Sequence, residues 1–169
     1  MLSKLNIVLF EPEIPENVGN IARTCVGFNA TLHLIRPYGF FLDNKKLIRS
    51  GLDYWKDVQL IEHDSFNEFI KSIDENSHLF FITRYGKKST GEIAYCFDKP
   101  TYLIFGKEST GVDKEILKQY VDKTYRIPTS SNVRSLNLSN CAAMLAYDYV
   151  KHNLFENLSK IEPHKKDVL

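Results

Sequence analysis

Short apolar runs alternate with helical patterns along most of the chain, and this alternation constrains the fold more than any other feature. The run at residues 5–10 predicts a buried strand, and the apolar residues after it recur at the spacing of one helical face (Val18, Ile21, Ala22, Cys25, Val26). Further strands are predicted at 31–35, 58–61, 79–83, 102–105 and 124–127, and helices at 43–55, 65–73, 113–120 and 138–155. The alternation predicts an α/β fold, with a mostly parallel sheet flanked by helices.

The size of the chain predicts one domain, residues 1–158, followed by a polar, lysine-rich tail at 159–169. Hydrophobic residues make up 43% and charged residues 25% of the sequence, as is typical of soluble globular proteins. No apolar run reaches the ~18 residues that cross a bilayer, so we expect no membrane partner. The N-terminal residues run into the first strand without a signal-peptide cleavage pattern, which favours a cytoplasmic protein.

Charge and potential metal ligands narrow the function classes. A net charge of +1 argues against a protein that binds polyanions over its whole surface, although it allows a local basic patch. The three cysteines are far apart and match neither a disulfide framework nor a zinc site. The five histidines show no ligand spacing either, so we expect no metal and no histidine catalyst.

Four polar loops follow predicted strands, at residues 11–17, 83–91, 106–111 and 128–137. In parallel α/β sheets, ligands bind at the carboxyl ends of the strands. Because all four loops fall at strand ends, we expect them to form one composite site.

The first of these loops leads into a helix. Pro12 and Pro15 hold an extended segment, and we expect Asn17 to cap the helix. Asn20 and Arg23 are three residues apart, hence neighbours on the polar face. They are either solvated surface side chains or a pair that grasps a phosphate or an oxyanion.

The third and fourth loops differ in composition. In the segment at 104–111, IFGKESTG, Gly106 would allow a ligand to approach the backbone closely. The segment is neither a Walker A loop nor a dinucleotide-binding fingerprint, and alone it indicates a tight turn as readily as a site. The segment at 127–146 begins with hydroxyls, amides and one arginine and continues as an amphipathic helix, whose free N–H groups suit a polar ligand.

Three motifs, NVGNIAR at 17–23, IFGKESTG at 104–111 and IPTSSNVRSLNLSN at 127–140, together resemble those of the SPOUT superfamily of RNA methyltransferases. Their order and spacing match from about residue 5 to about residue 152. The short chain without an added RNA-binding domain is most similar to the tRNA (cytidine/uridine-34)-2′-O-methyltransferases of the YibK type. The resemblance implies an α/β fold whose C-terminal part forms a deep trefoil knot.

The resemblance also implies the cofactor S-adenosyl-L-methionine, held by backbone groups of three loops. By alignment, the cofactor-binding positions are Ile82, Thr83, Gly106, Ile127, Ser135 and Leu136. Members of the superfamily are homodimers that pair through the first and last helices. The small residues of the last predicted helix (Ser139, Ala142, Ala143, Ala146) would allow such pairing, but they fit equally well inside the core of a monomer.

The catalytic residues implied by the resemblance are Arg23, Asn17, Glu108, Ser135 and Asn137. The superfamily gives the central role to the arginine, and because an arginine side chain is effectively always protonated, we expect Arg23 to stabilise a developing alkoxide beside a phosphate. Asn17 would orient Arg23 or the ribose, Glu108 would hold its loop or Arg23, and Ser135 and Asn137 would complete the pocket.

The predicted RNA partner is the anticodon stem-loop of tRNA, methylated at the wobble nucleotide. Lys87, Lys88 and Arg134 are the RNA-binding candidates because their loops adjoin the site. Loop aromatics either stack on an unpaired base or pack in the core (Tyr38, Phe40, Phe41, Tyr85). In the second motif, Lys107 and Thr110 depart from the proline and arginine of many relatives, which puts an RNA contact by that arginine in doubt. Two alternatives stay open: 2′-O-methylation at another tRNA or rRNA position, and a non-catalytic RNA-binding knot protein.

Overall fold

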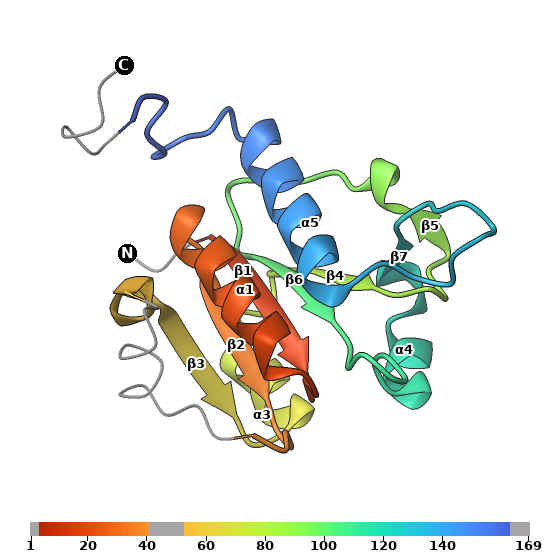
Figure 1. Ribbon diagram of the computed structural model, residues 1–169. Coiled ribbons are helices and arrows are strands. Elements are labelled where there is room, and N and C mark those ends of the chain that lie inside the picture. The colour runs from red at the N-terminus through yellow and green to blue at the C-terminus, as the bar shows by residue number, and fades with distance from the viewer. Residues whose placement is uncertain (1–3, 41–52, 163–169) are drawn as a thin grey trace.

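A parallel sheet forms the centre of the computed structural model, which describes residues 4–40 and 53–162 (Figure 1). Within these residues the strands are β1 Leu5–Phe10, β2 Thr31–Ile35, β3 Gln59–His63, β4 His78–Ile82, β5 Lys88–Ser89, β6 Thr101–Phe105 and β7 Thr124–Arg126. Their order in the sheet is β3-β2-β1-β6-β4-β7-β5, and the paired strands are parallel. The predicted α/β architecture is confirmed. The strand β5 was not predicted, because a strand of two residues is too short to show an alternating pattern of apolar side chains.

The described helices are α1 Pro15–Gly27, α3 Phe66–Ser72, α4 Lys114–Gln119 and α5 Leu138–His152, with 3₁₀ turns η1 Asp53–Asp57, η2 Thr90–Glu92 and η3 Val121–Lys123. Most of the helix predicted at 43–55 lies outside the described residues. The last helix ends three residues before its predicted limit, because Leu154 and Phe155 take positive φ angles that leave the helical region. None of the described helices is both long and apolar enough to cross a membrane.

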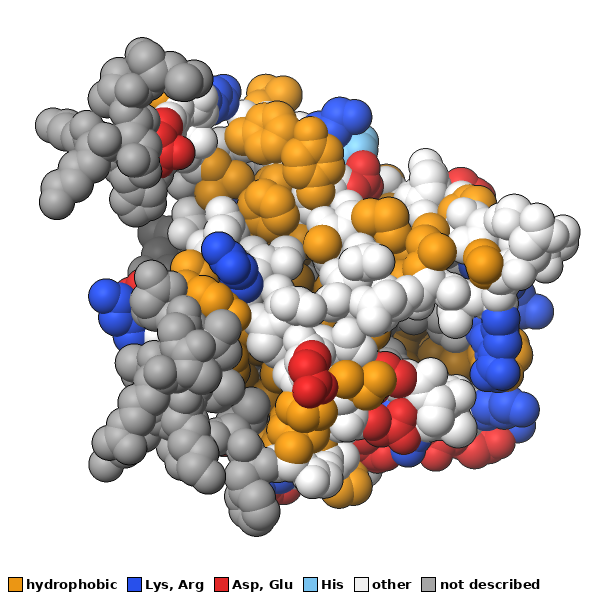
Figure 2. Space-filling model, in the orientation of Figure 1, with side chains coloured by type: hydrophobic (Ala, Val, Ile, Leu, Met, Phe, Trp, Pro, Cys, Tyr) orange, Lys and Arg blue, Asp and Glu red, His pale blue; other side chains and the backbone are white. Residues whose placement is uncertain are grey.

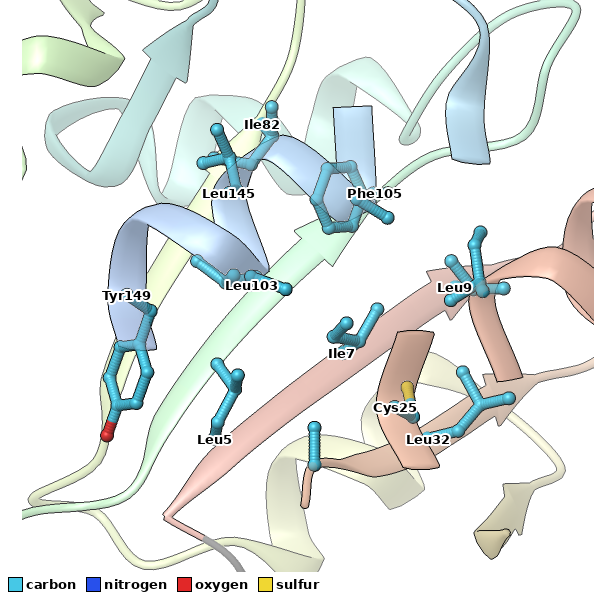
Figure 3. Close-up of a cluster of buried hydrophobic side chains, with 14 of the residues drawn as sticks. Leu5, Ile7, Leu9, Cys25, Leu32, Ile82, Leu103, Phe105, Leu145 and Tyr149 are labelled. Carbon is cyan, nitrogen blue, oxygen red and sulfur yellow. The ribbon is translucent and has the colours of Figure 1, made fainter. Parts of the chain in front are cut away.

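The strand pleat sends alternate side chains to two separate cores. Ile7 and Leu9 of β1 face the side covered by α1 and α5, where they pack with Leu145 and other apolar side chains (Figure 3). Val8 and Phe10 face the opposite side, which α3 and α4 cover. Because each fully buried aliphatic side chain contributes roughly 1.5–3 kcal/mol, both layers anchor the sheet firmly.

Helices α1 and α5 also contact each other over the sheet (Figure 1). The predicted apolar face of α5 is confirmed at four positions that are buried (Ala142, Leu145, Ala146, Tyr149). Ala142 and Ala146 therefore already belong to the core of the single chain, whereas Ser139 and Ala143 remain partly exposed.

Three buried polar side chains, Asn6, His33 and His63, form a row of hydrogen bonds on the face of the sheet that α3 covers. His33 Nε2 lies 3.2 Å from Asn6 Oδ1, and His33 Nδ1 lies 2.9 Å from His63 Nε2. Since Asn6 Oδ1 can only accept, His33 donates through Nε2 and accepts the His63 N–H at Nδ1. Both rings are neutral in this arrangement, and burial lowers the pKa of His33 to about 4 and also lowers the pKa of His63.

The connection from β4 to β5, residues 83–87, crosses the end of β7. Both β4 and β5 pair with β7, with Ile82 and Lys88 level with Tyr125 on its two sides. The Thr83 N–H donates to the Tyr125 carbonyl at 2.9 Å. A Cβ on Gly86 would lie 2.2 Å from the carbonyl carbon of Tyr125, so only glycine lets the connection pass this close.

Candidate active site

A cavity of about 410 Å³ opens at the carboxyl ends of β4, β6 and β7. Its lining includes all six predicted cofactor-binding residues (Ile82, Thr83, Gly106, Ile127, Ser135, Leu136). It also includes Asn17, Glu108, Asn137 and Arg134 of the predicted catalytic and RNA-binding sets. The expectation of one composite site at the strand ends agrees with this cavity, because residues from all four polar loops line it.

The loop after β6 forms one wall and closes tightly on itself. The Gly111 N–H donates to the Lys107 carbonyl at 2.9 Å, and Gly111 has φ +80°, which favours glycine. A Cβ on Gly106 would lie 2.1 Å from the backbone nitrogen of Val112. Its own loop therefore already requires glycine at position 106, and the prediction that a ligand approaches the backbone here is an additional one, at a residue that lines the cavity.

The segment that enters α1 is held by a distant loop. The prediction that Asn17 caps this helix is wrong. The helix α1 begins at Pro15, so Asn17 lies inside it, and the N-cap residue, Ile14, makes no side-chain cap bond. Instead the Glu108 carboxylate accepts the backbone N–H groups of Glu13 at 2.9 Å and Ile14 at 3.3 Å. A carboxylate suits this position because the helix N-terminus carries free N–H groups and a positive dipole end.

Two further residue pairs join the same two loops, and in these the acceptors lie in the loop before α1 and the donors in the loop after β6. Glu13 accepts the N–H and the hydroxyl of Ser109, both at 2.8 Å, and these bonds lower the pKa of the Glu13 carboxyl. Lys107 forms an ion pair with Glu11 at 2.6 Å. The sequence reasoning missed Glu11 and Glu13, although the alternating carboxylates beside Pro12 were a signal that this loop binds something.

Asn17 connects all three motifs. Its side-chain nitrogen donates to Glu108 at 2.8 Å, and its side-chain oxygen accepts from Asn137 Nδ2 at 3.1 Å. Asn137 in turn caps α5, accepting the N–H groups of Ser139 at 2.9 Å and Asn140 at 3.3 Å. The Glu108–Asn17–Asn137 network therefore ties the starts of α1 and α5 to the loop after β6.

Arg23 lies apart from this network. It is exposed, and it does not line the cavity of its own chain. Its guanidinium carbon lies 5.5 Å from the ring centroid of Tyr54, and the Tyr54 hydroxyl donates to the Gly19 carbonyl at 3.1 Å. The structure thus brings together Asn17, Glu108 and Asn137, and leaves Arg23 about two helical turns along α1.

The predicted RNA-binding residues divide into two groups. Arg134 is exposed and lines the cavity. Lys87 and Lys88 lie outside the lining, and Lys88 donates to the Asp122 carbonyl at 3.0 Å. Of the loop aromatics, Tyr85 lines the cavity.

The other loop aromatics lie away from the cavity. Tyr38 and Phe40 stack on each other, with centroids 5.0 Å apart, and pack against the α1 side of the core. Phe41 lies outside the described residues. Core packing is therefore the correct alternative for Tyr38 and Phe40.

The cavity has the chemistry of a site for an organic cofactor. The lining combines apolar side chains with backbone groups at the ends of three strands; the apolar side chains are those of Ile82, Phe105, Ile127, Leu136 and Leu138. Such a lining can hold a flat ring against the apolar side chains while the backbone groups form hydrogen bonds to its edge. Among the described residues, no three His, Cys, Asp or Glu side chains gather as metal ligands.

Comparison with known proteins decides the family. The sequence profile of the SpoU rRNA Methylase family matches residues 4–147. The chain belongs to this family. The resemblance drawn from three motifs is therefore confirmed.

Close relatives of this SpoU family member carry names with a specific reaction. A Geobacillus stearothermophilus protein named "putative tRNA (cytidine(34)-2′-O)-methyltransferase" is 47% identical over 158 residues, which cover 92% of this chain and 99% of that protein. A crystal structure named for a "putative RNA methyltransferase from Bacillus anthracis" is 42% identical with a TM-score of 0.88, and covers 93% of this chain and 99% of that one.

Two other solved structures extend the comparison. One, described as "Structural insights into the 2-OH methylation of C/U34 on tRNA", is 41% identical with a TM-score of 0.80, and covers 88% of this chain and 96% of that one. AviRb from Streptomyces viridochromogenes, solved with AdoMet, is 22% identical with a TM-score of 0.74, over 89% of this chain and 58% of that one. This last likeness shows the shared fold alone.

Proposed function

We propose that this SpoU family member transfers a methyl group from S-adenosyl-L-methionine to the ribose 2′-hydroxyl of the wobble nucleotide, position 34, of tRNA. The cavity carries this proposal, because its lining joins the three motifs and contains all six predicted cofactor-binding positions. The names of relatives that match nearly the whole chain at 41–47% identity support the reaction and the nucleotide.

The residues present fit the cofactor. Ile127, Leu136 and Leu138 offer an apolar surface for the adenine, and the backbone of residues 82–83 and 106 lies at strand ends where it can meet polar groups. The Glu108–Asn17–Asn137 network would hold these walls in place rather than react. When bound, the cofactor supplies an electrophilic methyl group.

Arg23 is the proposed catalytic residue. Its guanidinium would bridge a phosphate of the RNA and the ribose 2′-oxygen as that oxygen loses its proton, and so stabilise the developing negative charge. Ser135, which is exposed at the cavity, would contact the ribose or the cofactor. Arg23→Ala should abolish methyl transfer with cofactor affinity near that of the wild type; retained turnover would contradict the assignment.

We also propose that the protein is a homodimer paired through α1 and α5. The outer face of α5 supports this, because Met144 and Tyr147 are 41% and 51% exposed. Figure 2 shows apolar side chains gathered over the end of this helix. Tyr147→Asp should shift the protein toward a monomer in sedimentation velocity, and an unchanged dimer would place the contact elsewhere.

A trefoil knot in the C-terminal part is proposed on the basis of the crossing at β7. β7 lies between β4 and β5, whose connection crosses its end, and the chain then continues through residues 127–137 to α5 on the sheet face (Figure 1). Pulling both termini in an optical trap tests the proposal. A knotted chain would unfold to less than the full contour length of 169 residues, at about 3.3–3.6 Å each.

The activity itself is tested with labelled S-adenosylmethionine and total tRNA, followed by mapping of the methylated nucleotide. Label at a 2′-oxygen of nucleotide 34 is the expected result, and the cytoplasm is where we expect the protein to meet this substrate. Label at another tRNA position, or in rRNA, would establish the alternative reaction. Absence of cofactor binding in calorimetry would favour a non-catalytic RNA-binding protein.

A further inference from the structure

We propose that Tyr85, flanked by Arg84 and Lys114, forms a nucleobase-binding subsite at the mouth of the cavity, where the base of the target nucleotide stacks. The inference rests on the proposed function and adds to it the residue that holds the base. Tyr85 lies in the loop after β4, and Lys114 lies at the start of α4, so two elements far apart in the sequence build the subsite.

The position and exposure of Tyr85 carry the argument. Its side chain lines the cavity and is also 44% exposed to solvent. A ring that borders both the cavity and the solvent can contact a ligand that enters from the solvent side. A large flat apolar surface at a polar rim is typical of a recognition site.

The charges around Tyr85 match a nucleotide. The Arg84 guanidinium carbon lies 4.6 Å from the ring centroid, and the Lys114 ammonium lies 5.7 Å from it. Figure 2 shows Lys and Arg side chains gathered at the edge of the molecule beside α4. A base on the ring would bring its own phosphates within reach of both cations, whereas a neutral aromatic ligand would leave them unused.

The backbone holds the ring in place. The Gly86 N–H donates to the Thr83 carbonyl at 3.1 Å, so Arg84 and Tyr85 are the central residues of a tight turn. Arg126 donates from Nη1 to the Arg84 carbonyl at 3.0 Å and braces the same turn from β7. Since the turn is already ordered, stacking on Tyr85 costs little conformational entropy.

The subsite gives a physical reason for selection of an unpaired nucleotide. Only a base that has left its helical stack exposes a face to an aromatic side chain, and bases of an anticodon loop meet this condition. Every base has such a face, so stacking alone tolerates both cytidine and uridine.

Fluorescence of an anticodon stem-loop RNA with 2-aminopurine at nucleotide 34 tests the proposal directly. Stacking should quench the base on wild-type protein and on Tyr85→Phe, which keeps the ring. Tyr85→Leu keeps the apolar bulk without the aromatic face, so it should lose the quenching and weaken RNA binding roughly 5- to 150-fold, the range for one stacked base. The KM for tRNA should rise in parallel, while S-adenosylmethionine affinity in calorimetry stays close to that of the wild type.

The contribution of Lys114 has a matched control on the same helix. Lys114→Ala should reduce the slope of log Kd for RNA against log salt concentration by about 0.7, as expected for one phosphate contact with a single strand. Lys118→Ala should leave the slope unchanged, because Lys118 is paired with Glu115 at 2.6 Å, whereas the ammonium that lies over the Tyr85 ring is that of Lys114.

Two outcomes would overturn the inference, and they are distinct. Unchanged quenching and affinity in Tyr85→Leu, with an active wild-type protein, would reject the subsite alone. Failure of the wild-type protein to bind or methylate any tRNA would reject the proposed function and the subsite together.

Discussion

Removal of the Glu108 carboxylate tests whether this residue stabilises α1 or takes part in the chemistry. In the structure it accepts two backbone N–H groups at the start of α1 and the Asn17 amide, at 2.8–3.3 Å. Each hydrogen bond contributes about 0.5–1.5 kcal/mol net, and loss of a negative charge near the helix dipole adds about 0.3–1 kcal/mol. Including the unpaired Asn17 amide, we expect Glu108→Ala to lower the free energy of unfolding by about 2–4 kcal/mol.

Glu108→Gln refines the prediction. Glutamine keeps one acceptor oxygen, but its NH₂ group replaces the oxygen that faces the Glu13 N–H, so one donor then faces another. We expect a loss of about 1–2 kcal/mol, smaller than for alanine. Ser109→Ala serves as the control in the same loop, since its exposed hydroxyl bond to Glu13 should contribute less than about 1 kcal/mol.

Equilibrium unfolding in urea at one protein concentration measures these differences. The unfolding midpoints should fall in the order wild type, Ser109→Ala, Glu108→Gln, Glu108→Ala, with similar slopes. Calorimetry with S-adenosylmethionine should show weaker binding in both Glu108 variants, because the loop that forms one wall of the cavity is no longer held to α1. Unchanged unfolding and cofactor binding in Glu108→Ala, with methyl transfer lost, would refute the structural role and assign Glu108 to the chemistry.

Three further predictions concern other parts of the chain. Burial lowers the pKa of His33 to about 4, so the stabilisation from its neutral pairing with His63 should be complete above pH ~6.5 and decline as the pH falls toward 4. The free energy of unfolding of His33→Gln should therefore depend less on pH between 7 and 5 than that of the wild type, and an equal dependence in both proteins would contradict this. Gly86→Ala places a Cβ 2.2 Å from Tyr125 and should lower the free energy of unfolding by about 1–3 kcal/mol or prevent folding, whereas an unchanged melting temperature would show that the crossing is not tight. Cys141 lines the cavity, and burial raises the pKa of its thiol, so alkylation by N-ethylmaleimide should be slow and slower still with bound cofactor; mass spectrometry that finds no protection would place the cofactor elsewhere.

Local sequence pattern was sufficient for most of the fold. The runs at 5–10 and 31–35 became β1 and β2 with the predicted limits, because a strand buried on both faces needs apolar side chains at almost every position. The face of α5 was also predictable, since helical spacing fixes which side chains share a side. Ser65 accepts the Glu68 N–H at the start of α3, a contact within one helical turn and therefore visible in sequence.

Side-chain roles were less predictable, because they depend on partners far along the chain. Asn17 resembled a helix cap by its position, yet it lies inside α1 and bonds to Glu108, 91 residues away. Gly106 was predicted as a ligand contact and does line the cavity, but the structure adds a reason for glycine that the sequence did not show: the Gly111–Val112 backbone occupies the space where a Cβ would lie. In both cases the residue type indicated a special role, but the sequence did not show which distant residue lies beside it.

The sequence by itself determined an α/β fold, polar loops at the strand ends and three motifs that identify the family, since these properties depend on spacing along the chain. Only the tertiary structure decided which of the motif residues meet. It joins Glu108, Asn17 and Asn137 in one network, leaves Arg23 outside the cavity, and places Tyr85 in the cavity lining with Lys114 over its ring. The physical reason is that hydrogen bonds and ring contacts act over a few ångströms in space, and the order of strands in the sheet sets which loops come that close.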